Sequence, residues 1–129
     1  MLDHISLGVT DLPRARAFYD AVLETLGYQR LFDHEDVVSA YGPEAPQYHF
    51  WIGLPLDEGK PAAPCNGSHI CFQAPNRPAV DAFHATALAQ GGADAGAPGL
   101  RPEYTETYYA AFAQDPDGHK IEAVCHAPE

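Results

Sequence analysis

Residues 4–9 read HISLGV and residues 69–74 read HICFQA, and these two stretches decide the fold. In each of them apolar residues alternate with polar or small ones, which is the pattern of a β-strand with one covered face. Ile5, Leu7 and Val9 point to one side of the first strand and His4 points to the other. His69 holds the same position in the second stretch. The sequence therefore predicts two strands that each begin with a histidine on the uncovered face.

The two strands belong to a longer repeat with a constant offset of 65 residues, the distance between His4 and His69. A period of this length that occurs twice is too long for a solenoid and indicates a duplicated module. The identities that support it are His4/His69, Ile5/Ile70, Pro13/Pro78, Ala17/Ala82, Phe18/Phe83, Leu23/Leu88 and Gly27/Gly92.

A helix is predicted after each strand, at residues 12–27 and 77–92. Asp11 or Thr10 can cap the first helix and Asn76 the second, because short polar side chains accept hydrogen bonds from the first free backbone N–H groups. Each helix has a proline early and a glycine at its end. The positions expected to face the core are Ala15, Phe18, Val22 and Leu26 in the first helix and Val80, Phe83, Ala87 and Leu88 in the second.

Three short β-like segments follow each helix, at residues 28–34, 36–42 and 47–54 and again at 92–98, 107–115 and 119–126. We therefore predict an α+β fold of one domain over residues 1–129, made of two tandem βαβββ modules. Module 1 spans residues 1–58 and module 2 spans residues 66–129. Their paired sheets are expected to form an incompletely closed cleft with the helices outside. Residues 55–68 are predicted to link the modules, and 96–103 to form a second mobile loop.

The charge excludes several classes of partner. The net charge is −11 with only seven Lys and Arg, so the chain cannot readily neutralise a phosphate backbone, and we expect no nucleic-acid partner. No segment approaches the roughly 18 consecutive apolar residues of a membrane span, and the opening residues lack the pattern of a signal peptide. The sequence thus predicts a cytoplasmic protein with no membrane contact.

The remaining cysteines and histidines show no recognisable motif. Cys65, Cys71 and Cys125 have no Cys-x-x-Cys spacing and are expected to be reduced thiols that are mostly buried. The histidines with no predicted partner, which are expected at the surface, are His34, His84, His119 and His126.

Three side chains of the two modules could meet in the cleft. His4 and His69 are expected to point into it, and Glu122 lies between the apolar Ile121 and Ala123 and so projects to the opposite face from them. Imidazole and carboxylate ligands suit a divalent transition metal such as Fe, Mn, Zn, Ni or Co. The sequence predicts a metal site made of His4, His69 and Glu122 with positions open for a substrate.

The segments HISLGVTDLPRARAFY (4–19), SHICFQAP (68–75) and DPDGHKIEAV (115–124), within paired βαβββ modules, resemble the vicinal oxygen chelate superfamily. This superfamily includes glyoxalases, fosfomycin-resistance proteins, extradiol dioxygenases and bleomycin-resistance proteins. The resemblance implies metal ligands on the first and last strands of each module, which carries over to His4, His69 and Glu122. It also implies a homodimer, and whether the modules pair within one chain or between chains stays open.

One departure from the family pattern concerns the fourth ligand. The counterpart of Glu122 in module 1 lies near Trp51 or Ile52, where glyoxalase I enzymes supply a carboxylate or an amide. The missing ligand favours the three-ligand pattern of the dioxygenase and resistance branches.

Further side chains are assigned to the substrate. We expect Glu122 and Tyr109 to be catalytic, and the predicted substrate-binding residues are Trp51, Tyr104, Arg101 and His49.

The leading functional hypothesis is a metal-dependent lyase or isomerase of the glyoxalase type. Such an enzyme binds a small substrate through two vicinal oxygens and stabilises an enolate or oxyanion. The alternatives are a ring-cleaving extradiol dioxygenase and a small-molecule binding protein of the bleomycin-resistance type, whose cationic ligand the net charge of −11 would suit.

Overall fold

The structure is a computed structural model that describes all 129 residues. It contains, in chain order, β1 (Ile5–Gly8), α1 (Leu12–Glu24), β2 (Gln29–His34), β3 (Val38–Gly42), β4 (Phe50–Gly53), β5 (His69–Gln73), α2 (Arg77–Ala89), β6 (Ala93–Leu100), β7 (Tyr109–Gln114) and β8 (Lys120–Cys125). The order βαβββ therefore occurs twice, as the repeat predicts. Neither helix has the length and apolar composition that crossing a bilayer demands.

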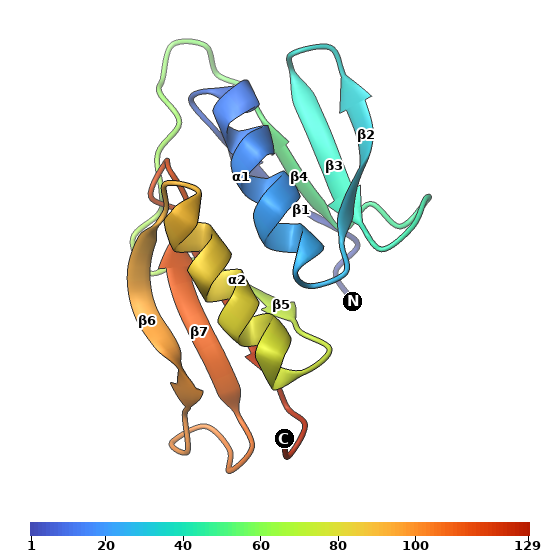
Figure 1. Ribbon diagram of the computed structural model, residues 1–129. Helices are drawn as coiled ribbons and strands as arrows, with labels where there is room; N and C mark the ends of the chain where they lie inside the picture. Colours follow the sequence, from blue (N-terminus) through green and yellow to red (C-terminus); the bar gives the residue numbers. More distant parts are fainter.

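Each module forms its own four-stranded mixed sheet. The strand orders are β1-β4-β3-β2 and β5-β8-β7-β6, and in both sheets the first and last strands of the module run parallel while the others pair antiparallel. Figure 1 shows α1 and α2 on the same side of the molecule, in front of the two sheets. The opposite side of each sheet, which we call its open face, carries no helix. This arrangement confirms the predicted α+β fold of tandem modules.

Both helices begin as the sequence predicts. The Asp11 carboxylate accepts a hydrogen bond from the Arg14 backbone N–H at 3.1 Å, and the Asn76 side chain accepts one from the Ala79 N–H at 2.9 Å. Each cap satisfies a backbone donor that has no partner within its helix. The two helices thereby start at equivalent points of the repeat.

The core runs across both modules. Its 22 buried residues come from both helices and both sheets. Phe50 of β4 and Phe72 of β5 meet edge to face with 5.3 Å between ring centroids, and the Tyr28 ring lies 6.1 Å from that of Phe72. Aromatic pairs in this geometry add to the free energy gained by burial. The two modules are therefore held together by apolar packing.

The turn between β7 and β8 also joins the modules. Buried Asp115 accepts a hydrogen bond from the Tyr19 hydroxyl of α1 at 2.6 Å. Asp117 accepts one from the Thr10 N–H at 3.1 Å, and His119 Nε2 donates to the Gly8 carbonyl at 2.7 Å. The sequence predicted a turn here but not that it contacts the first module.

Two expectations about local structure are wrong. Residues 96–103 do not form a loop throughout, because β6 extends to Leu100 and pairs with β7 through an irregular register that tolerates its glycines. Leu88, expected inside, is 41% exposed, whereas its repeat partner Leu23 is fully buried. Identity in the repeat therefore does not guarantee the same burial.

The expectations about Cys65, Cys71 and His84 also need correction, whereas His34 and His126 are exposed as expected. Only Cys125 is buried, and Cys65 and Cys71 are exposed. His84 is buried and bonds to Asp94 at 2.8 Å, while the His126 ring packs on Tyr108. Their partners come from distant or adjacent strands, which residue spacing does not reveal.

Candidate metal and substrate site

The register of the sheets identifies the module 1 counterpart of Glu122. Ser6 of β1 pairs with Trp51 of β4, and Cys71 of β5 pairs with Glu122 of β8. Because Ser6 and Cys71 are related by the 65-residue offset, Trp51 and Glu122 occupy equivalent positions. A tryptophan thus stands in module 1 where module 2 has a carboxylate.

Glu122 is a buried carboxylate on the open face of the second sheet. Its side chain is 2% exposed, and both of its oxygens are engaged. Oε1 accepts a hydrogen bond from the Tyr108 hydroxyl at 2.6 Å, and Oε2 lies 3.0 Å from Nε2 of His69. A buried charge needs such partners, since leaving water costs several kcal/mol without them. The contacts fix the orientation of this carboxylate.

The protonation of the neighbouring groups follows from the same surroundings. Desolvation, followed by the hydrogen bond to Glu122, raises the pKa of Tyr108 well above its ordinary value. Desolvation and then the Glu122 carboxylate raise the pKa of the Cys71 thiol to about 12. Both groups are protonated at neutral pH, so Tyr108 is a hydrogen-bond donor and Cys71 is not a thiolate nucleophile.

A pocket of about 640 Å³ opens beside Glu122, and we call it the carboxylate pocket. Among the predicted site residues it contains His69, Glu122, Arg101 and Tyr104. Three residues that are not among the predicted site residues also line this pocket: Tyr108, Phe112 and Lys120. Strand alternation could have identified Lys120, since residues two apart in a strand share a face.

Tyr109, which is predicted to be catalytic, does not line the carboxylate pocket. Its hydroxyl donates to Asp81 of α2 at 2.7 Å, and its ring packs against the core. Tyr109, the first residue of β7, turns toward α2, while Tyr108, which directly precedes the strand, turns toward Glu122. The tyrosine in contact with the carboxylate is Tyr108.

The other predicted residues meet in a second pocket, on module 1, which we call the aromatic pocket. Its lining includes His4, His49, Tyr48 and Trp51. The His4 and Trp51 ring centroids are 6.1 Å apart, and Phe32 packs on Trp51 at 5.9 Å. The His4 side chain is 51% exposed. His4 and Trp51 therefore present an open aromatic surface.

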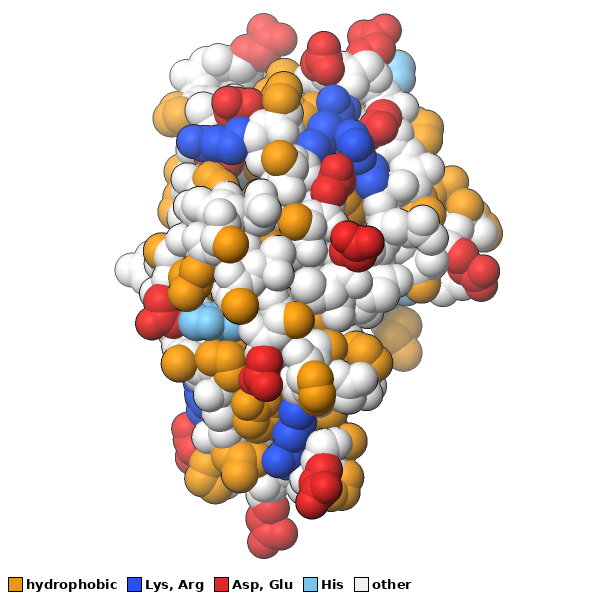
Figure 2. All heavy atoms as spheres, viewed as in Figure 1, with side chains coloured by type: hydrophobic (Ala, Val, Ile, Leu, Met, Phe, Trp, Pro, Cys, Tyr) orange, Lys and Arg blue, Asp and Glu red, His pale blue; other side chains and the backbone are white.

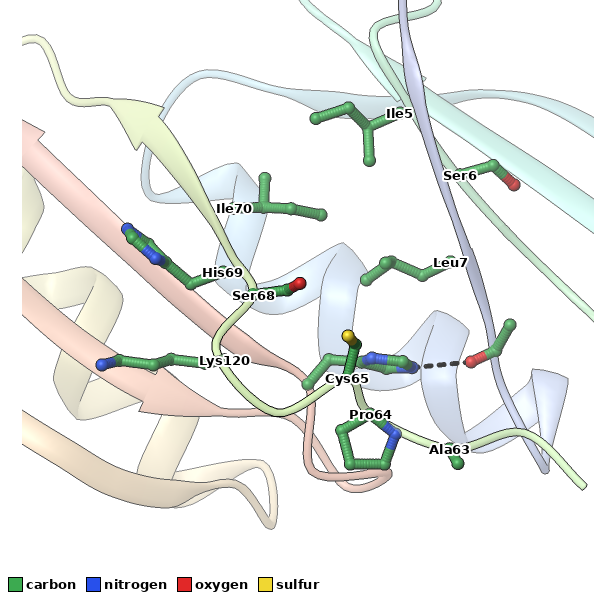
Figure 3. A pocket seen from close by; sticks show the side chains of 12 residues that line it. Ile5, Ser6, Leu7, Ala63, Pro64, Cys65, Ser68, His69, Ile70 and Lys120 are labelled. Carbon is green, nitrogen blue, oxygen red and sulfur yellow. Dashed lines mark hydrogen bonds between the residues drawn. The ribbon is translucent and has the colours of Figure 1, made fainter.

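The two predicted histidine ligands do not share a pocket within the chain. The edge strands β1 and β5 lie on either side of a third cavity, of about 370 Å³, whose lining includes the apolar Ile5, Leu7 and Ile70. Figure 3 shows His69 pointing away from β1, toward the side on which Lys120 lies. No group of three His, Cys, Asp or Glu side chains in the single chain is arranged to hold a metal ion. The expected single cleft is thus divided between two pockets.

His69 and Glu122 nevertheless fit a shared ion. Two neighbouring ligands at right angles, each about 2.1 Å from a metal, are about 3.0 Å apart. The separation between Nε2 of His69 and Oε2 of Glu122 is 3.0 Å. Imidazole nitrogen with carboxylate oxygen is also a donor set that borderline divalent ions accept.

Comparison with known proteins gives one family. The sequence profile of the Glyoxalase/Bleomycin resistance protein/Dioxygenase superfamily matches residues 1–123. No curated protein matches the chain.

Solved structures agree with this family. A glyoxalase/bleomycin resistance protein from Albidiferax ferrireducens T118 is 37% identical, with a TM-score of 0.87 over 97% of this chain and 98% of that one. A lactoylglutathione lyase from Agrobacterium tumefaciens is 18% identical, with a TM-score of 0.64 over 97% and 92% of the two chains. A fosfomycin resistance protein from Listeria monocytogenes is 19% identical, with a TM-score of 0.67 and the same coverage. The last two similarities show the fold alone.

Proposed function

The chain belongs to the glyoxalase/bleomycin resistance protein/dioxygenase superfamily, and from this premise we propose that it is a metal-dependent enzyme acting as a dimer. In the proposed dimer, His69 and Glu122 of one copy and His4 of a second copy bind one divalent transition metal. The observation that carries the proposal is the 3.0 Å contact between Nε2 of His69 and Oε2 of Glu122. The Glu122 side chain is buried, and its other oxygen accepts a hydrogen bond from Tyr108.

The placement of His4 supports a site that two copies complete. His4 is exposed beside Trp51 on the open face of module 1, while His69 and Glu122 lie on that of module 2. If a twofold axis sets one face against the other, His4 of each copy reaches the carboxylate pocket of its partner. A twofold interface repeats every contact, so the dimer would hold two identical sites.

The chain's own residues prepare this site for a substrate with two adjacent oxygens. The Tyr108 phenol stays protonated and donates its one O–H to Glu122, which fixes the orientation of this carboxylate in the pocket. The rings of Trp51, Tyr48 and Phe32 supply an apolar wall. A bound divalent ion supplies Lewis-acid polarisation of the substrate oxygens. Lyase or isomerase chemistry of the glyoxalase type follows from this combination.

The experiment is the metal content of untagged protein purified without chelators, measured by elemental mass spectrometry. We expect about one Fe, Mn, Ni, Zn or Co per chain, and loss of this metal in His4→Ala. The matched control is His34→Ala, which removes an exposed histidine of β2. Absence of metal after reconstitution with each ion, or full metal content in His4→Ala, would contradict the proposal.

The aromatic pocket favours a second candidate function, sequestration of an aromatic ligand. Four rings, those of His4, Phe32, Tyr48 and Trp51, lie next to one another there. Binding to the folded state must raise its thermal midpoint. A rise with cationic aromatic glycopeptides in metal-free protein would favour sequestration, and oxygen uptake with a catechol would favour dioxygenation.

A further inference from the structure

The basic side chains are few, and their pairing is uneven. Seven Lys and Arg face 18 Asp and Glu in the sequence. Arg14, Arg16, Arg30 and Lys60 each form a salt bridge with an aspartate. The basic side chains that form none are Arg77, Arg101 and Lys120. Two of these three, Arg101 and Lys120, line the carboxylate pocket.

The acidic side chains are spread over much of the surface and reach both ends of the molecule in the view of Figure 2. In a chain with a net charge of −11, two of the three basic side chains without an acidic partner line the same pocket. With the Glu122 carboxylate counted, Arg101 and Lys120 still leave the carboxylate pocket with a net positive charge on an acidic protein.

Both cations are positioned on one ring. The Lys120 ammonium lies 4.8 Å from the centroid of Phe112, and the Arg101 guanidinium carbon lies 5.6 Å from it. An aromatic face attracts a cation without neutralising it. Lys120 is also the ladder partner of His69, so the positive charge sits directly beside a proposed metal ligand.

Arg101 is held in place before any ligand binds. Its Nη1 donates to the Gly99 carbonyl at 2.9 Å and its Nη2 to the Ala97 carbonyl at 2.8 Å. Gly96 makes this position possible, since a Cβ atom there would lie 3.0 Å from the Phe112 ring and 3.4 Å from Arg101 Nη2. The carbonyls orient the guanidinium and leave its net charge available.

Glu122 does not neutralise these cations. Its oxygens accept from the Tyr108 hydroxyl and lie against His69, and neither Arg101 nor Lys120 forms a salt bridge with it. Because the one buried carboxylate of the pocket is already engaged, an incoming acidic group has two free cationic partners.

We infer that Arg101 and Lys120 form an anion subsite, which binds a carboxylate or phosphate group of the substrate beside His69 and Glu122. This inference rests on the proposed function in taking the carboxylate pocket as the substrate site. It narrows the substrate class to organic acids that carry two vicinal oxygens at one end and an acidic group at the other. Guanidinium and ammonium groups are the side chains that recognise both kinds of anion.

The test is a titration of the ¹⁵N-labelled full chain with inorganic phosphate and, separately, with acetate. Amide chemical shifts are followed at neutral pH and constant ionic strength, before and after EDTA treatment. We expect saturable shifts centred on Gly96, Arg101, Phe112 and Lys120. Lys120→Gln should weaken binding about five-fold or more, and Lys120→Arg should restore it.

Lys60→Gln is the matched control, because it removes the same charge from an exposed lysine paired with Asp57 in the linker. Phosphate and acetate affinities should be unchanged in this variant. The inference is overturned if neither anion shifts these amides, if Lys120→Gln and Lys60→Gln weaken binding equally, or if tetramethylammonium binds here in place of the anions.

A response to one anion only identifies the acidic group and supports the subsite. Because binding is measured on EDTA-treated protein, a failure of metal binding would overturn the proposed function and leave the anion result standing. Metal binding without any response to either anion would overturn the anion subsite and leave the proposed function standing.

Discussion

The two modules have the same strand order, helix caps and first-strand histidine, but their open faces differ. Module 1 has Trp51 where module 2 has Glu122, and Ala40 where module 2 has Phe112, as their ladder partners establish. One face is aromatic and uncharged at these positions, and the other is built around a buried carboxylate. The shared core repeats residues such as Phe18 and Phe83, whereas the open faces repeat the first-strand histidine but differ at Trp51 and Glu122.

The duplicated fold tolerates change at some positions more than at others. A core position must match the packing of its neighbours, since interiors are as dense as organic crystals. Trp51 and Glu122 on the open faces do not belong to the shared core, so these positions can hold a ring or a ligand without changing the packing between the modules.

The largest effect is expected from the repeat pair Leu23 and Leu88. Leu23 is fully buried and Leu88 is 41% exposed. Leu23→Ala should lower the free energy of unfolding by about 2–5 kcal/mol, because it leaves a cavity. Leu88→Ala should cost less than about 1 kcal/mol. Urea denaturation followed by circular dichroism measures both, and equal losses would show that the two helices pack alike.

The next comparison is between the equivalent positions Glu122 and Trp51. Glu122→Gln removes a proposed ligand charge and should weaken metal binding about 100-fold or more, beyond the 10–100-fold typical of outer-shell changes. Trp51→Phe should retain the metal, since it alters only the aromatic wall. Competition with a chelating dye gives both affinities. Metal retained at full affinity in Glu122→Gln would remove Glu122 from the site.

The contact between modules provides a third test. Tyr19→Phe leaves buried Asp115 without its 2.6 Å donor and should lower the free energy of unfolding at neutral pH by about 1–3 kcal/mol. Desolvation and then Asp115 raise the pKa of Tyr19 in the folded state. The stabilisation is thus complete below about pH 10, the pKa of an unfolded tyrosine, and is lost as the pH rises further.

Denaturation at several pH values checks this sign. The difference in the free energy of unfolding between the wild type and Tyr19→Phe should become smaller above about pH 10. A difference that stays constant up to strongly alkaline pH would mean that the stabilisation does not come from the protonated Tyr19 hydroxyl bound to Asp115.

The smallest effect concerns the neighbours Tyr108 and Tyr109. Tyr108→Phe removes the hydrogen bond to Glu122 and should weaken metal binding about 10-fold, as expected for a group that orients a ligand. Tyr109→Phe, on the helix-covered face, should leave metal affinity unchanged. Isothermal titration of both variants with the metal gives the two affinities. A larger loss of metal affinity in Tyr109→Phe than in Tyr108→Phe would favour Tyr109 as the residue of the site.

Much of the fold could be predicted from the sequence because the same βαβββ module occurs twice in it. The alternation around His4 and His69 and the two capped helices give local signals that agree with each other. The extent of β6 was missed, since its glycines and proline resemble a loop and its pairing with β7 is not a local property.

The candidate site was predictable in part. Strand alternation placed Glu122 on the open face, and the family resemblance drew attention to the three proposed ligands. The sequence could not tell Tyr108 from Tyr109, because that choice depends on where β7 begins. It also could not show that His4 and His69 lie in different pockets, since the placement of one module against the other is a tertiary property.

We propose that each metal site takes His4 from one copy and His69 and Glu122 from another. The most direct test mixes His4→Ala and Glu122→Gln chains, unfolds and refolds them together, and measures bound metal. Each variant alone should bind none. Random dimerisation in a 1:1 mixture should restore about a quarter of the wild-type sites, because half of the dimers are mixed and each has one intact site. No recovery in a mixture that forms mixed dimers would contradict the account.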